Sequence, residues 1–130
     1  MGCHIKPEQF FNLIFGYYDY YWHYNSTTNW GAGYNAMDGV AVPAGEVWVV
    51  VAAHIKNITR GASMAISVKN AAGQNIGLKS ATTSGAGEAM TWSGMAILKE
   101  GDYIFYEIGD AVAGDSGNWG SLGYKMKLSQ

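Results

Sequence analysis

The sequence predicts an all-β fold, a single antiparallel β-sandwich of jelly-roll type. Glycine accounts for 18 of the 130 residues against two prolines, and only 14% of the residues are charged. Short apolar runs recur about every ten residues, separated by turns rich in Gly, Asn, Ser and Asp. This spacing is typical of a sandwich of about seven or eight short strands, because a parallel α/β sheet would need helices between its strands.

The N-terminal residues 1–36 differ in composition from the rest, since they hold eleven of the eighteen aromatic residues. Pro7 and Glu8 favour a helix start, because proline suits the first turn and an acidic side chain suits the positive end of the helix dipole. We expect a short helix over residues 7–15, ended by Gly16, and then an extended segment. Residues 25–29 and 31–33 are predicted as loops. The sequence thus predicts an N-terminal aromatic arm (1–36) and a β-sandwich domain (37–130).

The β-domain is predicted from successive strand patterns. Residues 46–55 form the strongest strand, which is apolar on both faces for six residues, as in a strand buried on both sides. Residues 63–69 alternate strictly and place Met64, Ile66 and Val68 inward. Further strands are predicted at 76–79, 88–98, 103–108 and 119–128, with Leu122 and Tyr124 on one face of the last. The expected core consists of Val47, Val49, Val51, Ile66, Val68, Met90, Trp92, Ile97, Phe105 and Leu122.

No group of residues makes a convincing catalytic site, and we expect no enzyme, no metal and no cofactor. The string 114–117, Gly-Asp-Ser-Gly, matches the surroundings of the nucleophile in chymotrypsin-like proteases, but that chemistry needs a His and an Asp from a preceding barrel. Asp110, Asp115 and Asn118 would supply fewer than the about six to eight oxygens that calcium prefers. His54 is interpreted as a half-buried, hydrogen-bonded residue in an apolar strand rather than as a base.

Charge and cysteine content restrict the partners. The formal net charge is −2, from eight basic and ten acidic residues, which argues against binding nucleic acid by phosphate neutralisation. The single cysteine, Cys3, rules out an intrachain disulfide. The apolar run at residues 10–15 is too short to span a bilayer and lacks a cleavage site after it, so we expect synthesis in the cytoplasm and no membrane partner.

The aromatic segment predicts a binding surface. Adjacent side chains of an extended chain point to opposite sides, so its rings cannot all face a core. Tyr and Trp suit subunit contacts, because each combines a large apolar area with a polar tip, and they also stack on sugars. The predicted interface residues are Phe10, Phe11, Phe15, Tyr17, Tyr18, Tyr20, Tyr21, Trp22, Tyr24 and Trp30. The alternative sugar-stacking set is Tyr20, Trp22, Trp30 and Trp119.

The turns and strands of the β-domain carry a resemblance over residues 38–128. Its elements are Val-Pro-Ala-Gly-Glu-Val-Trp at 42–48, Trp-Ser-Gly at 92–94, Leu-Lys-Glu-Gly-Asp-Tyr-Ile at 98–104 and Gly-Tyr-Lys-Met at 123–126. This part of the chain resembles small structural proteins of tailed bacteriophages, namely capsid decoration (cement) proteins and tail-fibre tips.

The resemblance implies a non-enzymatic virion structural protein that binds and stabilises a capsid surface. Its partners would be its own copies, in a dimer or trimer, and the shell of major capsid protein. Its location would be the virion, after synthesis in the host cytoplasm. The alternative function is a carbohydrate-binding module or a receptor-binding fibre tip, and an enzyme is a distant third. If the aromatic arm mediates assembly, deleting residues 1–30 should leave the β-domain folded and abolish assembly.

Overall fold

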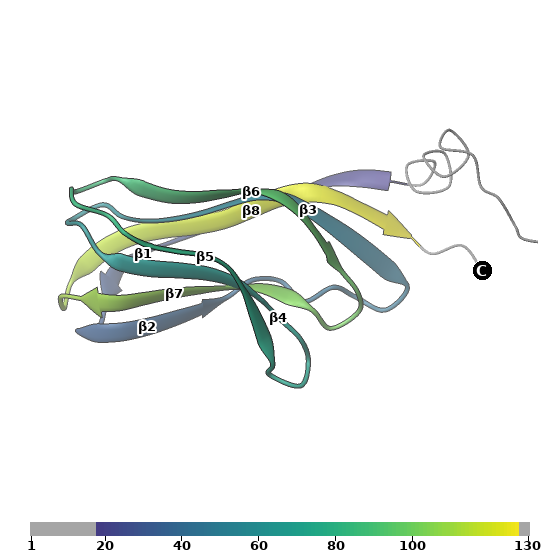
Figure 1. Cartoon of the computed structure of the whole chain (residues 1–130), viewed down its shortest axis with the longest axis horizontal. Coiled ribbons are helices and arrows are strands. Elements are labelled where there is room, and N and C mark those ends of the chain that lie inside the picture. Colours follow the sequence, from purple (N-terminus) through teal and green to yellow (C-terminus); the bar gives the residue numbers. More distant parts are fainter. Residues whose placement is uncertain (1–17, 128–130) are drawn as a thin grey trace, which may run out of the picture.

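The computed structural model describes residues 18–127, which form two four-stranded antiparallel sheets packed as a sandwich, without a helix in that range. Figure 1 shows the two layers and the long strands that run along them. The all-β sandwich predicted from the sequence is confirmed. The helix expected at residues 7–15, Cys3, and the aromatic residues Phe10, Phe11, Phe15 and Tyr17 lie outside the described residues.

The strand order is that of a jelly roll. Sheet A contains, in spatial order, β1 (Tyr18–Trp30), β8 (Asp115–Lys127), β3 (Glu46–Asn57) and β6 (Ala89–Leu98). Sheet B contains β2 (Gly33–Asp38), β7 (Tyr103–Ala111), β4 (Ser63–Lys69) and β5 (Asn75–Thr82). The first strand pairs with the last, the second with the seventh, the third with the sixth and the fourth with the fifth. The chain is therefore one long antiparallel hairpin rolled into two sheets.

The sandwich includes residues 18–36, although the composition of the sequence predicts a separate arm there. β1 pairs with β8 in unbroken register from Tyr18↔Met126 to Thr27↔Gly117, and β2 pairs with β7. Residues 25–29, expected as a loop, continue β1 because β8 offers a partner along this length. Deleting residues 1–30 would therefore remove an edge strand and two core residues, Tyr21 and Trp30, so that truncation cannot test assembly alone.

The core lies between the inner faces of the two sheets. Ile66, Met64 and Met90 are buried there as predicted, and Val68 and Trp92 pack against its margin. The inner rings include two stacked pairs, Tyr21–Trp48 with centroids 4.8 Å apart and Trp30–Trp119 with centroids 5.9 Å apart. Burial raises the pKa of the Tyr21 and Tyr106 hydroxyls.

The inward face of β3 differs from the prediction. Trp48 and Val50 point into the core, whereas Val47, Val49 and Val51 do not belong to it. Because this run is apolar on both faces, its sequence does not indicate which side chains point into the core. The pairing of β3 is also irregular between Val50 and Ala52, so inward and outward side chains change places after this point. Val49 is nevertheless buried, on the outer side of sheet A.

Three other predicted core residues also lie outside the core. The register places Leu122 beside Ala52 and Ile97 beside Val49 on the outer face of sheet A. Phe105 is buried on the outer side of sheet B, where the Lys69 ammonium lies 4.2 Å from its ring centroid. The core positions on β7 are instead Ile104, Tyr106 and Ile108, one residue out of phase with the prediction.

Glycines on β8 allow large rings to pack beneath this strand. A Cβ at Gly117 would overlap the Trp30 ring and the Lys56 carbonyl, and one at Gly123 would overlap the Val49 carbonyl. Gly117 thus leaves room for the Trp30 ring, and Gly123 leaves room for the backbone of β3.

The core assignment predicts a contrast between two isoleucines in paired strands. Ile66 on β4 is 0% exposed, whereas Ile76 on β5 is 74% exposed. We expect Ile66→Ala to lower the free energy of unfolding by about 2–5 kcal/mol, through lost burial and a residual cavity. Ile76→Ala should change it by less than about 0.5 kcal/mol. Urea unfolding measures both, and similar losses from the two variants would contradict the assignment.

Candidate functional site

The outer face of sheet A carries an unusual concentration of apolar side chains. Residues directly opposite each other on neighbouring strands share a face. The register therefore aligns Tyr20, Tyr124, Val49 and Ile97 in one row across β1, β8, β3 and β6. A second row contains Trp22, Leu122, Ala52 and Ser93, and a third contains Tyr24, Gly120, His54 and Thr91. We define the aromatic face as Tyr20, Trp22, Tyr24, Val49, Ile97, Leu122 and Tyr124.

The two outer faces of the sandwich differ in chemistry. Trp22 and Ile97 are each 68% exposed on sheet A, and Tyr20 and Tyr24 are also exposed. On sheet B, the register puts Phe105 between Asp38 and Ser67, and Glu107 between Ala36 and Ala65. The exposed Tyr34 donates its hydroxyl hydrogen to Glu107 Oε2 at 2.8 Å. The outer face of sheet B therefore mixes charged and polar side chains with aromatic ones, whereas apolar side chains predominate on the outer face of sheet A.

The exposed rings of the aromatic face are arranged as a ladder. The Trp22 and Tyr24 rings are nearly parallel, at 12° with centroids 6.0 Å apart. The Tyr24 ring is in turn stacked on His54, at 22° with centroids 6.3 Å apart. Gly120 separates these two residues in the register and has no side chain, so their rings can meet across β8. Tyr20 meets Tyr124 edge to face at 6.4 Å.

A shallow groove of about 240 Å³ lies along this ladder. Trp22 and Tyr24 form one wall, and Thr91 and Ser93 on β6 form the other. The His54 ring is fixed by a 2.8 Å hydrogen bond between its Nε2 and Asn118 Oδ1, as expected for a half-buried histidine. The Thr91 and Ser93 hydroxyls make no hydrogen bond to any residue in 18–127, so both remain able to bind a ligand.

The structure separates the predicted binding residues into two groups. Tyr20, Trp22 and Tyr24 are exposed, whereas Tyr21 and Trp30 face the core. Trp30 is 4% exposed and Trp119 is 8% exposed, and each stacks on the other. Neither ring can serve as a sugar platform, and Tyr21 and Trp30 cannot form a partner surface. The physical reason is the alternation of side chains along a strand, which sends every second ring inward.

Sequence reasoning missed the residues that complete the aromatic face on the other strands. The sequence predicts Val49, Ile97 and Leu122 in the core, the first two because they lie in apolar runs. The alternation over residues 119–128 had placed Leu122 and Tyr124 together, but the sequence did not identify the outer side of the sheet. Only the cross-strand register brings them beside Tyr20 and Trp22.

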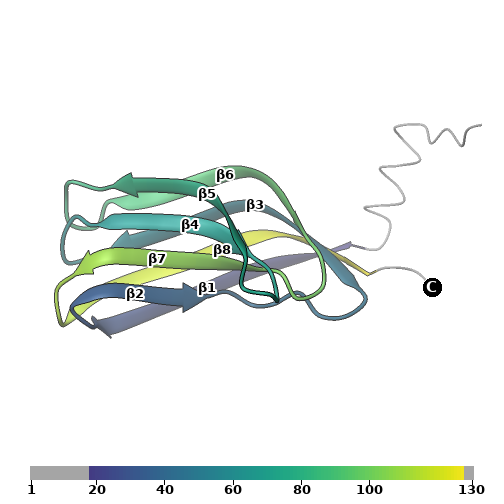
Figure 2. The same ribbon diagram turned by 60° about the horizontal axis from the view of Figure 1, so that its bottom comes forward.

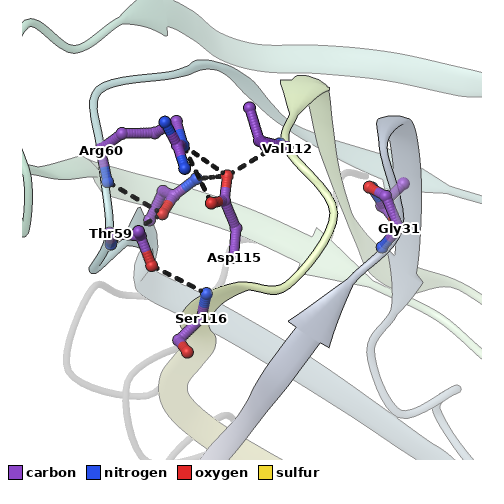
Figure 3. A network of polar contacts seen from close by, with 8 residues as sticks. Gly31, Thr59, Arg60, Val112, Asp115 and Ser116 are labelled. Carbon is purple, nitrogen blue, oxygen red and sulfur yellow. Dashed lines mark hydrogen bonds and ion pairs between the residues drawn. The ribbon is translucent and has the colours of Figure 1, made fainter.

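The Gly-Asp-Ser-Gly string at 114–117 lies where the β7–β8 turn leads into β8, and it contains a buried carboxylate, that of Asp115 (Figure 3). Asp115 is 1% exposed, and Arg60 Nε donates to both of its oxygens, at 2.9 and 3.0 Å. Asn57 Nδ2 and the Val112 backbone N–H donate to Oδ2, each at 2.9 Å. Burial alone would raise the Asp115 pKa, but these hydrogen bonds and the Arg60 charge hold that pKa below its usual value.

The three oxygen-bearing residues considered for calcium are bound to different partners. Asp110 accepts from the Ser63 backbone N–H at 2.8 Å, Asn118 binds His54, and Asp115 binds Arg60. Within residues 18–127, no three His, Cys, Asp or Glu side chains are grouped so that they could hold a metal ion. Over the same residues, no helix has the length and apolar character needed to cross a bilayer.

Comparison with known proteins gives distant structural similarities. No family model matches the chain, and no curated protein is similar in sequence. A pilus protein of Bacillus endospore appendages is 13% identical with a TM-score of 0.48, over 86% of this chain and 91% of that one. TmCBM61, in complex with β-1,4-galactotriose, is 16% identical with a TM-score of 0.40, over 88% and 92%.

A virus protein is similar at the same level. The chain from infectious bursal disease virus strain Gx is 10% identical with a TM-score of 0.40, over 85% of this chain. This chain corresponds to only 33% of that viral chain. Similarity of this kind concerns the arrangement of strands and says nothing about what this chain binds.

The buried carboxylate predicts how stability depends on pH. Asp115→Asn should lower the free energy of unfolding by about 2 kcal/mol at pH 7, because it removes charge-assisted hydrogen bonds. Since the pKa is lower in the folded state, this stabilisation is present above about pH 4 and is lost as pH falls through the folded pKa. Urea unfolding from pH 7 to pH 3 should therefore show the two proteins converging.

The exposed Asp110 provides the matched control, since it accepts a single hydrogen bond from Ser63. Asp110→Asn should have a smaller effect at every pH. A constant difference between wild type and Asp115→Asn down to pH 3 would contradict the role given to the Asp115 charge.

Proposed function

We propose that this protein is a non-enzymatic structural protein of a virion, which assembles through the aromatic face in the manner of a capsid decoration protein. The observation that carries the proposal is the asymmetry of the sandwich. Exposed Tyr20, Trp22, Tyr24 and Ile97 share the outer face of one sheet, while the outer face of the other mixes aromatic residues with charged and polar ones. Large exposed apolar patches on small domains mark interaction sites.

The aromatic face suits burial against another protein. Its rings are attached to strands rather than to loops, so little conformational entropy is lost when they are covered. Trp and Tyr are the side chains that most often dominate interface energetics. The Trp22 and Tyr24 rings already stack on each other in the unbound chain.

The proposed partners are other copies of this chain, in a dimer or trimer, and a shell of major capsid protein. Closed symmetry of this kind is the usual form of small homo-oligomers. The resemblance of residues 38–128 to phage structural proteins supports a place on the virion. With a net charge of −2, the chain is not expected to bind nucleic acid. We expect neither a cofactor nor a membrane partner.

A second candidate function, carbohydrate binding, is favoured by the groove beside the ring ladder. Parallel rings can stack on the C–H face of a sugar, and the Thr91 and Ser93 hydroxyls opposite them could bind sugar hydroxyls. The same residues would then bind a sugar, as in a receptor-binding fibre tip, and would not form a contact between subunits.

Disrupting the aromatic face should dissociate the protein. We expect full-length wild type to be a dimer or trimer, and Tyr20→Ser combined with Trp22→Ser to be a monomer, because both exposed side chains contribute apolar area to the contact. Light scattering coupled to size exclusion measures the mass. Tyr34→Ser, on the outer side of sheet B and 60% exposed, should leave the mass unchanged. A monomeric wild type, or an oligomer that survives the double substitution, would refute this function.

The carbohydrate function predicts a different result. Calorimetric titration with neutral β-linked trisaccharides of glucose, galactose and N-acetylglucosamine should show binding by wild type, and Trp22→Ala should weaken it at least about tenfold through loss of stacking. Tyr34→Ala should bind as wild type does. Absence of heat with all three sugars, or equal affinity of wild type and Trp22→Ala, would count against this candidate.

A further inference from the structure

Four strands form the edges of the two sheets, and they differ in how well they are protected. β1 and β6 are the edges of sheet A, and β2 and β5 are the edges of sheet B. Figure 2 shows β5 and β6 along one side of the sandwich and β1 and β2 along the other. An edge strand exposes unpaired backbone N–H and C=O groups, which natural proteins usually block with charge, proline, irregularity or short length.

Three of these edges carry such protection. On β6 the pairing is irregular opposite Val50 and Ala52, and Lys79 Nζ donates to the Thr91 carbonyl at 2.8 Å. β5 supplies this lysine and has its own register shift opposite Ile66 and Ser67. β2 spans only Gly33–Asp38, and its pairing shifts between Gly33 and Asn35.

β1 lacks these features over ten residues. Its register with β8 is regular from Tyr18 to Thr27, and this stretch contains no proline, lysine or arginine. Asp19 is its one acidic residue. Burial lowers the pKa of His23, so that the ring is held neutral at pH 7. The free side of β1 is therefore a long, straight and nearly uncharged template for another strand.

We propose that β1 pairs antiparallel with β1 of a second copy of this chain, which joins the two copies of sheet A into one eight-stranded sheet. The inference rests on the proposed function, because it identifies the contact that builds the homo-oligomer. Pairing with an identical strand is favoured because it can form about a twofold axis perpendicular to the sheet. Such an axis leaves the aromatic faces of the two copies on the same side of the joined sheet. The exposed rings of the two copies then lie opposite one another as cross-strand pairs.

The geometry of this pairing is restricted. In an antiparallel pair, directly opposed residues point to the same face of the sheet. Residues on one face of β1 are separated by an even number of positions. The twofold axis must therefore lie at one residue of β1, which opposes its own copy, and not between two residues. We place the axis at a residue from 22 to 24, which brings Tyr20, Trp22 and Tyr24 of the two copies into the paired region. This range also places Asp19 opposite residue 25, 27 or 29, so that the two Asp19 carboxylates are never directly opposed. The edge is thus compatible in charge with its own copy.

Disulfide mapping along β1 tests this pairing. In a full-length Cys3→Ser background, single cysteines replace Tyr20, Trp22, His23, Tyr24 or Asn25, and Ser80→Cys on the β5 edge is the control. Cα atoms of opposed residues lie about 4.5–5.5 Å apart, within reach of a disulfide, whereas sheets packed face to face are about 10 Å apart. Oxidised samples are analysed by non-reducing electrophoresis, after thermal unfolding has shown that each variant is folded.

We expect a cysteine at one β1 position to give mostly covalent dimer. A cysteine two residues away should give a yield of covalent dimer that is lower by about fivefold or more, because the two copies of that cysteine are too far apart for a disulfide. The Ser80→Cys control should stay monomeric. If no β1 cysteine cross-links better than the control while light scattering still finds an oligomer, edge pairing is refuted and assembly through the aromatic face stands. A monomeric wild type would refute both proposals.

Discussion

The alternation of side chains along β1 determines which surfaces this protein offers. Tyr21 turns inward and stacks on Trp48, so Tyr20, Trp22 and Tyr24 must turn outward. The inner face is occupied by rings and aliphatic side chains, and the Trp30 ring packs there against Gly117 of β8. An aromatic-rich strand built into a narrow sandwich therefore leaves part of its aromatic area in solvent.

The rest of the fold holds this exposed area in a fixed arrangement. Pairing of β1 with β8 and of β8 with β3 sets the rows on which Tyr124, Leu122 and Val49 extend the aromatic face. At one end of the sandwich, the buried Asp115 carboxylate joins the β3–β4 loop to the β7–β8 hairpin through Arg60 and Asn57. The aromatic face is thus carried by strands held in register by sheet pairing, and such fixed side chains would lose little entropy if a partner covered them.

Much of this architecture follows from the sequence, because alternation and turn residues are local signals. The sequence predicts β4 together with its buried residues, and six other strands overlap segments predicted as extended. It does not predict β2, whose pairing is short and irregular. The orientation of β3 could not be predicted, since Val47 to Val51 are apolar on both sides and only pairing with β8 and β6 selects Trp48 and Val50 as inward. The aromatic face was predicted only in part, because Ile97 and Leu122 join it through pairings between distant strands.

Solvent access to Trp22 in the assembled protein tests the central claim most directly. Trp30, Trp48 and Trp119 are buried and Trp92 is partly buried, so Trp22 should dominate fluorescence quenching by acrylamide in the monomer. Across a dilution series, we predict that the quenchable fraction falls as the protein associates, and that Trp22→Phe removes the concentration-dependent part. A Trp22 signal that is quenched equally in the monomer and in the oligomer would contradict burial of the aromatic face.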